Sequence, residues 1–123
     1  MSTRILIIDD ERDLCHLLKI IFQKEKFLVD CAYSLQDAGQ KILLRPQIIF
    51  LDNNLPDGSG LDYYHDHPGE FIQSTVILIT ADNDALTKMK AMNAGITFYI
   101  QKPFSVKEIK VIIKKILSGN DQR

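Results

Sequence analysis

One stretch decides the fold: Ile48-Ile49-Phe50-Leu51-Asp52-Asn53-Asn54-Leu55-Pro56-Asp57-Gly58-Ser59-Gly60. Four large apolar residues lead directly into a carboxylate, and a turn rich in Asn, Pro, Asp and Gly follows. A continuous apolar run closed by turn residues is typical of a strand that is buried on both faces of a sheet. We therefore expect Asp52 at the carboxyl end of such a strand, where an ionised side chain must be paired or bound to a metal.

Length and composition favour one globular domain. The 123 residues are 46% hydrophobic and 25% charged, with a net charge of −1. This balance gives no indication of nucleic acid or a membrane as a direct partner. The apolar runs are too short to cross a bilayer, so a cytoplasmic location is expected. No repeat or linker divides the chain, which predicts a single domain over residues 1–119 and a polar tail, or the start of a linker, over 120–123.

Four more short apolar segments have the β-branched composition of strands. They cover residues 4–8, 27–32, 75–80 and 97–101, and the second is the least apolar, which favours a place near an edge. Helical spacing is clearest from Asp13 to Lys26. Its expected inward residues are Leu14, Leu17, Leu18, Ile21 and Phe22.

Capping residues and helix breakers indicate four further helices. Their expected beginnings are Ser34, Leu61, the run Asp82-Asn83-Asp84, and the capping box of Ser105 with Glu108. Five strands then alternate with five helices. Such alternation predicts right-handed crossovers and an α/β fold, with a five-stranded parallel sheet covered on both faces.

Functional side chains follow four of the five expected strands. They are Asp9 and Asp10, Asp52, Thr80, and Lys102. In a parallel sheet the carboxyl ends of the strands lie at one edge, where ligands bind. Three carboxylates close together repel one another, and a hard divalent cation relieves that repulsion, so the pattern predicts a Mg²⁺ site.

Other readings of these residues remain open at this point. The segment Asp9-Asp10-Glu11 would also favour the N-terminus of a helix, and Lys102-Pro103 would also fit a plain turn. His65 and His67 invite a zinc site, although such residues beside a helix breaker are usually solvated. Neither GxxxxGK[ST] nor GxGxxG occurs, which argues against a nucleotide-binding domain.

Taken together, these segments resemble the receiver domain of two-component response regulators, of the chemotaxis-response-regulator type. The resemblance runs from Arg4 to about Leu117 and implies a flavodoxin-like sheet with strand order 2-1-3-4-5. The matching segments are Ile7-Ile8-Asp9-Asp10-Glu11, Leu51-Asp52 with Leu55-Pro56 and Asp57-Gly58, Thr80-Ala81, Ala94-Gly95, and Tyr99-Ile100-Gln101-Lys102-Pro103-Phe104.

The resemblance implies a role for each residue of the acidic site. Asp52 would be the phosphoacceptor. Asp10 would bind Mg²⁺ directly, Asp9 through water, and Asn54 through its backbone carbonyl. Lys102 would pair with Asp52 and later with a phosphoryl oxygen.

It also implies a switch. Thr80 would hydrogen-bond the phosphoryl group, and Tyr99 would move inward as Thr80 moves. The Lys102–Pro103 peptide bond would be cis. Asn54 and Asp82 correspond to positions that tune hydrolysis of the acyl phosphate.

The resemblance finally implies partners. The donor would be a sensor histidine kinase or a histidine phosphotransfer protein. The switched surface would be formed by the fourth helix, fifth strand and fifth helix, and would control an output such as transcription through an effector beyond Arg123 or a phosphorylation-linked dimer. The alternatives are a degenerate receiver that only binds a partner and a Mg²⁺-dependent phosphatase. Apart from promoting its own phosphorylation and dephosphorylation, the protein is not expected to be an enzyme.

Overall fold

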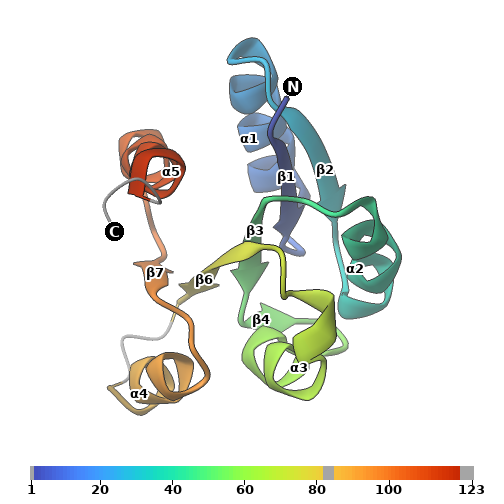
Figure 1. The fold of residues 1–123 in the computed structure, drawn as a ribbon, viewed down its shortest axis with the longest axis vertical. Coiled ribbons are helices and arrows are strands. Elements are labelled where there is room, and N and C mark those ends of the chain that lie inside the picture. Colours follow the sequence, from blue (N-terminus) through green and yellow to red (C-terminus); the bar gives the residue numbers. More distant parts are fainter. Residues whose placement is uncertain (1, 82–84, 120–123) are drawn as a thin grey trace.

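A computed structural model describes residues 2–81 and 85–119. A five-stranded sheet forms its centre, with all neighbouring strands parallel and in the order β2-β1-β3-β6-β7 (Figure 1). Numbered along the chain within this sheet, that order is 2-1-3-4-5. The predicted α/β class and strand order are therefore confirmed. The strands are β1 (Arg4–Ile8), β2 (Leu28–Ala32), β3 (Ile48–Asp52), β6 (Thr75–Thr80) and β7 (Phe98–Gln101).

Helices cover both faces of the sheet (Figure 1). Side chains of α1 and α5 share a core with one face, and those of α2, α3 and α4 share a core with the other. A short hairpin of two strands with two residues each, which the sequence pattern does not predict, follows β3. The remaining elements are α1 (Arg12–Lys24), α2 (Leu35–Lys41), η1 (Ile42–Leu44), β4 (Asn54–Leu55), β5 (Gly58–Ser59), α3 (Gly60–Asp66), η2 (Pro68–Glu70), α4 (Ala85–Asn93) and α5 (Val106–Gly119).

Strand β3 is buried along its whole length, as its apolar run predicts. Ile48 and Phe50 face the core under α1 and α5, whereas Ile49 and Leu51 face the opposite core. Side chains alternate along a strand, so burial on both faces requires a run of apolar residues without interruption. The same run brings Asp52 to the edge of the sheet.

Helix α1 differs from its expected form in one inward position. Leu17 is 49% exposed, whereas Cys15, Leu18 and Phe22 are the buried residues. The spacing of three and four residues places Cys15, Leu18 and Phe22 on one stripe, and Leu17 lies beside that stripe. The helix also ends at Lys24 rather than Lys26.

The helix starts agree with the capping signals where the structure describes them. The Ser105 Oγ accepts a hydrogen bond from the Glu108 N–H at 3.1 Å, and Glu108 Oε1 accepts one from the Ser105 N–H at 3.2 Å, which is a full capping box. The Ser34 Oγ accepts from the Asp37 N–H at 3.1 Å. The caps expected at Asp82, Asn83 and Asp84, and the hydrolysis role implied for Asp82, lie outside the described residues.

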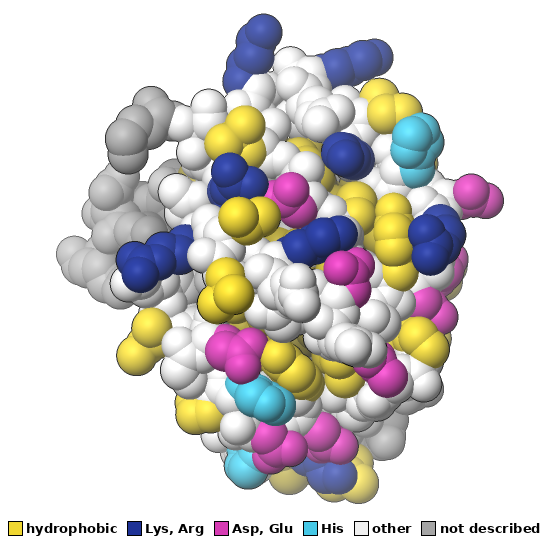
Figure 2. All heavy atoms as spheres, turned by 90° about the vertical axis from the view of Figure 1, so that its right-hand side faces the viewer, with side chains coloured by type: hydrophobic (Ala, Val, Ile, Leu, Met, Phe, Trp, Pro, Cys, Tyr) yellow, Lys and Arg dark blue, Asp and Glu magenta, His cyan; other side chains and the backbone are white. Residues whose placement is uncertain are grey.

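The surface beside α2 carries hydrophobic side chains scattered among charged ones (Figure 2). Lys and Arg predominate in the upper half of that view, and Asp and Glu in the lower half (Figure 2).

Among the described residues, no helix has both the length and the hydropathy needed to span a bilayer.

Candidate functional site

The four strand ends that carry functional side chains lie next to one another. Asp9 follows β1, Asp52 ends β3, Thr80 ends β6 and Lys102 follows β7, and these strands are consecutive in the sheet. Backbone hydrogen bonds continue past the strand ends, from the Asp9 N–H to the Ala32 oxygen at 2.9 Å and from the Lys102 N–H to the Thr80 oxygen at 2.8 Å. The sheet itself therefore fixes the positions of these residues.

Three carboxylates converge at this edge. Asp9, Asp10 and Asp52 each offer an oxygen within 4.8 Å of the others, and within residues 2–81 and 85–119 no other group of three or more His, Cys, Asp or Glu side chains does so. Asp9 is fully buried and Asp52 is 2% exposed. The buried Asp9 Oδ2 lies 3.0 Å from the Lys102 Nζ, with which it forms an ion pair.

This donor set fits a hard divalent cation. Mg²⁺ is bound by one or two carboxylates and retains several waters, and here an exposed Asp10 provides an opening to solvent. Buried carboxylates are costly unless cations compensate them, and here one ammonium is shared among Asp9, Glu11 and Asp52. Asp9, Asp10 and Asp52 are thus the described residues that could hold such an ion.

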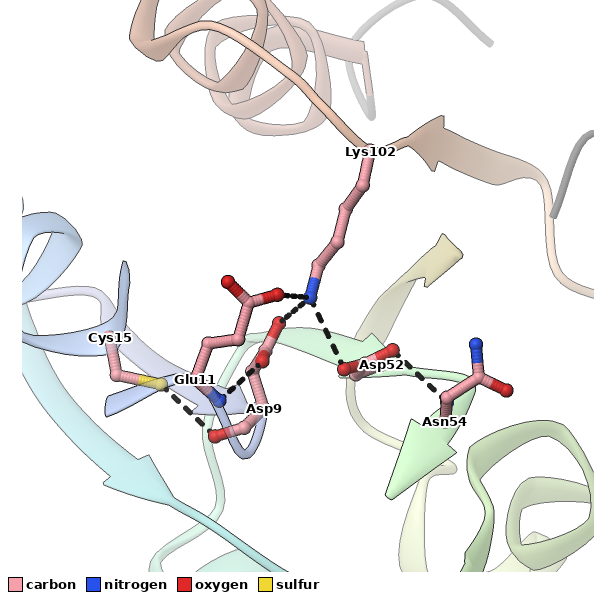
Figure 3. Close-up of polar contacts among 6 residues, drawn as sticks. All are labelled: Asp9, Glu11, Cys15, Asp52, Asn54 and Lys102. Carbon is pink, nitrogen blue, oxygen red and sulfur yellow. Dashed lines mark hydrogen bonds and ion pairs between the residues drawn. The ribbon is translucent and has the colours of Figure 1, made fainter. Parts of the chain in front are cut away.

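Lys102 supplies positive charge at the centre of the carboxylates (Figure 3). Its Nζ lies 3.0 Å from Asp9 Oδ2, 3.4 Å from Asp52 Oδ2 and 2.5 Å from Glu11 Oε1. Burial by itself would lower the pKa of Lys102, but its hydrogen bonds to Glu11 and Asp9 and the charge on Asp52 raise that pKa above its ordinary value. The ammonium therefore stays charged at any physiological pH.

Asp52 is held by the turn that follows it. Its Oδ1 accepts a hydrogen bond from the Asn54 N–H at 3.0 Å, and its Oδ2 faces Lys102. Burial, with a further contribution from the nearby Asp9, raises the pKa of Asp52 to about 6 despite the lowering effects of the Asn54 N–H and Lys102. In the absence of a metal, Asp52 is consequently ionised at pH 7 but at a cost in stability.

This cost predicts a pH-dependent effect of Asp52→Asn in metal-free buffer. A folded-state pKa of about 6 against an ordinary 3.8 means that the folded protein holds this proton more tightly than the unfolded chain. The stability that the proton confers is complete below pH 4 and disappears as the pH rises through 6. At pH 8 the variant should therefore exceed wild type in unfolding free energy, by at most about 3 kcal/mol at 1.36 kcal/mol per pKa unit. Urea denaturation in EDTA at pH 4 and pH 8 measures the difference, and an advantage equal at both pH values would contradict the assignment.

The turn after Asp52 depends on Asn53 and Gly60, whose roles are not evident from the sequence pattern. The Asn53 Oδ1 accepts hydrogen bonds from Ser59 Oγ at 2.9 Å and from the Leu61 N–H at 3.1 Å. The Gly60 N–H donates to the Asn53 backbone oxygen at 3.1 Å. A Cβ on Gly60 would come closer than 3.0 Å to the Asp52 carbonyl oxygen. The Asn, Pro and Gly residues of this segment indicate a turn, but the sequence pattern does not report these tertiary contacts.

Of the two residues implied for the switch, Thr80 ends β6 at the same edge, and Tyr99 lies within β7 opposite Leu78, two positions before Thr80 in the register. Thr80 is fully buried, and Tyr99 is half-buried against the core under α2, α3 and α4. The Lys102–Pro103 peptide bond is cis. Asn54 contacts Asp52 through its backbone N–H, and the residue is exposed.

Cys15, a buried free thiol, donates to the Asp9 backbone oxygen at 3.2 Å (Figure 3).

The two histidines near the end of α3 do not join a metal cluster within the described part of the chain. The His67 Nδ1 lies 2.9 Å from the Tyr63 backbone oxygen, and its ring stacks on Tyr63 at a centroid distance of 4.0 Å. His65 pairs with the exposed Asp66. Both histidines are thus accounted for by local contacts.

Comparison with known proteins identifies relatives over nearly the whole chain. The response regulator ArlR of Staphylococcus aureus is 35% identical over 123 residues, which are 98% of this chain and 55% of that protein. The chain thus spans about half the length of this curated relative.

Solved structures agree with the fold. A CheY-like receiver domain protein from Methanospirillum hungatei has a TM-score of 0.90 at 24% identity, covering 99% of this chain and 98% of that one. The beryllofluoride-activated NtrC4 receiver domain dimer has a TM-score of 0.81 at 33% identity, covering 90% and 93%.

The family itself follows from a match over most of the chain. The family model of the response regulator receiver domain matches residues 5–114. This range includes the whole sheet apart from Arg4, and it includes Asp9, Asp10, Asp52, Thr80 and Lys102. The chain belongs to the response regulator receiver domain family.

Proposed function

We propose that this receiver domain accepts a phosphoryl group on Asp52, with Mg²⁺, from a phosphohistidine donor. The observation that carries the proposal is the convergence of Asp9, Asp10 and Asp52 within 4.8 Å, with the Lys102 ammonium 3.4 Å from Asp52. A degenerate receiver that only binds a partner would not need all of these groups at once. Their presence in a chain of this family favours phosphoryl transfer.

The chain's own residues can perform each part of this transfer. Asp52 uses a carboxylate oxygen to form the new bond to phosphorus, and the bond from phosphorus to the donor's imidazole nitrogen breaks. Phosphoryl transfer needs alignment and charge neutralisation more than covalent assistance. Lys102 supplies positive charge beside Asp52, and the Asn54 N–H orients the carboxylate. Mg²⁺, held by Asp9, Asp10, Asp52 and the Asn54 carbonyl, would neutralise further charge on the carboxylates and the phosphoryl oxygens.

The proposal extends to the consequences of phosphorylation. The new group adds negative charge and acceptor oxygens beside Thr80, which would draw this residue toward Asp52 and allow Tyr99 to move inward. The surface of α4, β7 and α5 would then change its contacts. The NtrC4 receiver domain is described as a dimer when activated by beryllofluoride, and we propose a phosphorylation-linked dimer here as well.

The partners remain part of the proposal. A sensor histidine kinase or histidine phosphotransfer protein would be the donor, and an effector domain beyond Arg123 would carry the output, since ArlR is nearly twice as long as this chain. We also propose a cytoplasmic location. We infer that the domain is not a turnover phosphatase, because Asn54 stands two positions after the nucleophile and cannot donate a proton as an acid there would.

Labelling by acetyl phosphate tests the proposal. With Mg²⁺, intact-mass spectrometry should show one added phosphoryl group on wild type and none on Asp52→Asn, and EDTA should abolish the addition. Asp66→Asn is the matched control, because Asp66 is exposed and away from the site, and it should label like wild type. An unchanged mass of the wild-type protein would contradict phosphoryl transfer and favour the binding-only alternative. Release of many equivalents of phosphate from a phosphomonoester would favour the phosphatase.

A further inference from the structure

Lys102 has a third carboxylate partner that the phosphoacceptor role does not use. Glu11 Oε1 lies 2.5 Å from the Lys102 Nζ, nearer than Asp9 at 3.0 Å or Asp52 at 3.4 Å. Figure 3 shows Glu11 and Asp9 on the α1 side of the ammonium and Asp52 on its other side. The lysine is therefore displaced toward Glu11 and lies farthest from the residue that we expect to be phosphorylated.

The Glu11 side chain has no other task among the described contacts. Glu11 occupies the N-cap position of α1, where a side chain commonly accepts a hydrogen bond from the first turn, yet it makes no such bond. Its backbone N–H donates to Asp9 Oδ1 at 2.9 Å, which fixes the start of the helix beside the site. Its carboxylate is 60% exposed and is directed to Lys102. Helix capping thus does not explain the position of this carboxylate.

We propose that Glu11 is a positioning residue that holds the Lys102 ammonium on the α1 side of the site until a phosphoryl group on Asp52 draws it across. This inference rests on the proposed function, and it adds that Glu11 competes with Asp52 for the Lys102 ammonium. Before transfer, Glu11 shares the lysine charge that would otherwise face Asp52 and the anionic donor. After transfer, the phosphoryl oxygens on Asp52 outweigh the single exposed carboxylate of Glu11, because a partly exposed ion pair is weak.

The proposal predicts faster phosphorylation of Glu11→Gln. Glutamine keeps the size of the side chain and removes its charge, so Lys102 becomes free to face Asp52. The rate constant for labelling by acetyl phosphate at saturating Mg²⁺ should rise about threefold, the factor expected for an exposed ion pair of ordinary strength. Asp13→Asn is the matched control, because Asp13 is also exposed and lies in the first turn of α1, two residues after the N-cap Glu11, and this substitution removes the same charge. Equal acceleration in both variants would show a general charge effect and overturn the proposal.

The Lys102 side-chain resonances provide a second measurement that a merely structural role would not change. In the unphosphorylated protein, the ¹⁵Nζ and ¹³Cε shifts of Lys102 should differ between wild type and Glu11→Gln. In the phosphorylated proteins the two sets of shifts should coincide, because Lys102 has then left Glu11.

The outcomes separate this inference from the proposed function. Failure of wild type to label would contradict phosphoryl transfer, and the unphosphorylated spectra would still test the Glu11 contact. Normal labelling with Lys102 shifts that are identical in the two unphosphorylated proteins, or that still differ after phosphorylation, would overturn the inference alone.

Discussion

Lys102→Met is expected to lower the free energy of unfolding of the metal-free protein by about 3 kcal/mol, the loss typical when one partner of a buried ion pair is removed. Among the described residues, Lys102 is the only cation within ion-pair distance of Asp9 and Asp52. Asp9 is fully buried, and Asp52 is 2% exposed. Methionine retains most of the aliphatic stem, so the loss reports the missing charge rather than a cavity. The chain has no Trp, and urea denaturation in EDTA should therefore be followed by circular dichroism.

Lys110→Met is the matched control for this prediction. It removes the Lys110–Glu25 pair, which has the similar separation of 3.3 Å but half-exposed side chains, so its cost should stay below about 1 kcal/mol. Addition of Mg²⁺ should recover part of the loss in Lys102→Met and leave Lys110→Met unchanged, because a bound divalent cation compensates the same carboxylates. Similar losses in the two variants would mean that the carboxylates at the strand ends do not depend on Lys102.

The sheet could be predicted from the sequence because each central strand is buried on both faces. The predicted bounds of β1 and β6, residues 4–8 and 75–80, agree with the structure, and the lower hydrophobicity of β2 indicates its place near an edge. On that edge strand, Asp30 is partly exposed and pairs with Arg4 at 2.7 Å. Once the strand order is known, the meeting of Asp9, Asp52 and Lys102 follows, since parallel strands end at one edge.

The remaining features depend on contacts between distant segments, which periodicity does not report. The pairing of Glu11 with Lys102 joins residues 91 positions apart, and the sequence alone is equally compatible with helix capping by Glu11. The exposure of Leu17 in place of Cys15 depends on how α1 is rotated against the sheet. The β4–β5 hairpin pairs Asn54 with Ser59 and Leu55 with Gly58, in a segment where the sequence indicates only a turn. Among these contacts between distant segments, the close approach of Gly60 to Asp52 is expected to have the largest effect on stability when it is disturbed.

Gly60→Ala should destabilise the protein by about 3 kcal/mol and slow phosphorylation, although helix propensity alone predicts the opposite. Gly60 is the first residue of α3, and alanine is favoured over glycine within a helix by roughly 1 kcal/mol. Here, however, the added Cβ would lie closer than 3.0 Å to the Asp52 carbonyl oxygen and would press on the buried Leu51 side chain. Backbone has little freedom to move in a packed core, so the overlap outweighs the propensity.

Gly69→Ala separates this steric effect from the general consequences of replacing glycine. No atom lies within 4 Å of a Cβ built on Gly69, so this variant should match wild type within about 0.5 kcal/mol. Urea denaturation of the two variants gives the stability difference, and acetyl phosphate labelling shows whether Asp52 has moved. Because the overlap involves the peptide that carries Asp52, both measurements should change in Gly60→Ala and neither in Gly69→Ala. A Gly60→Ala protein of normal stability that labels at the normal rate would show that the turn can move away without disturbing Asp52.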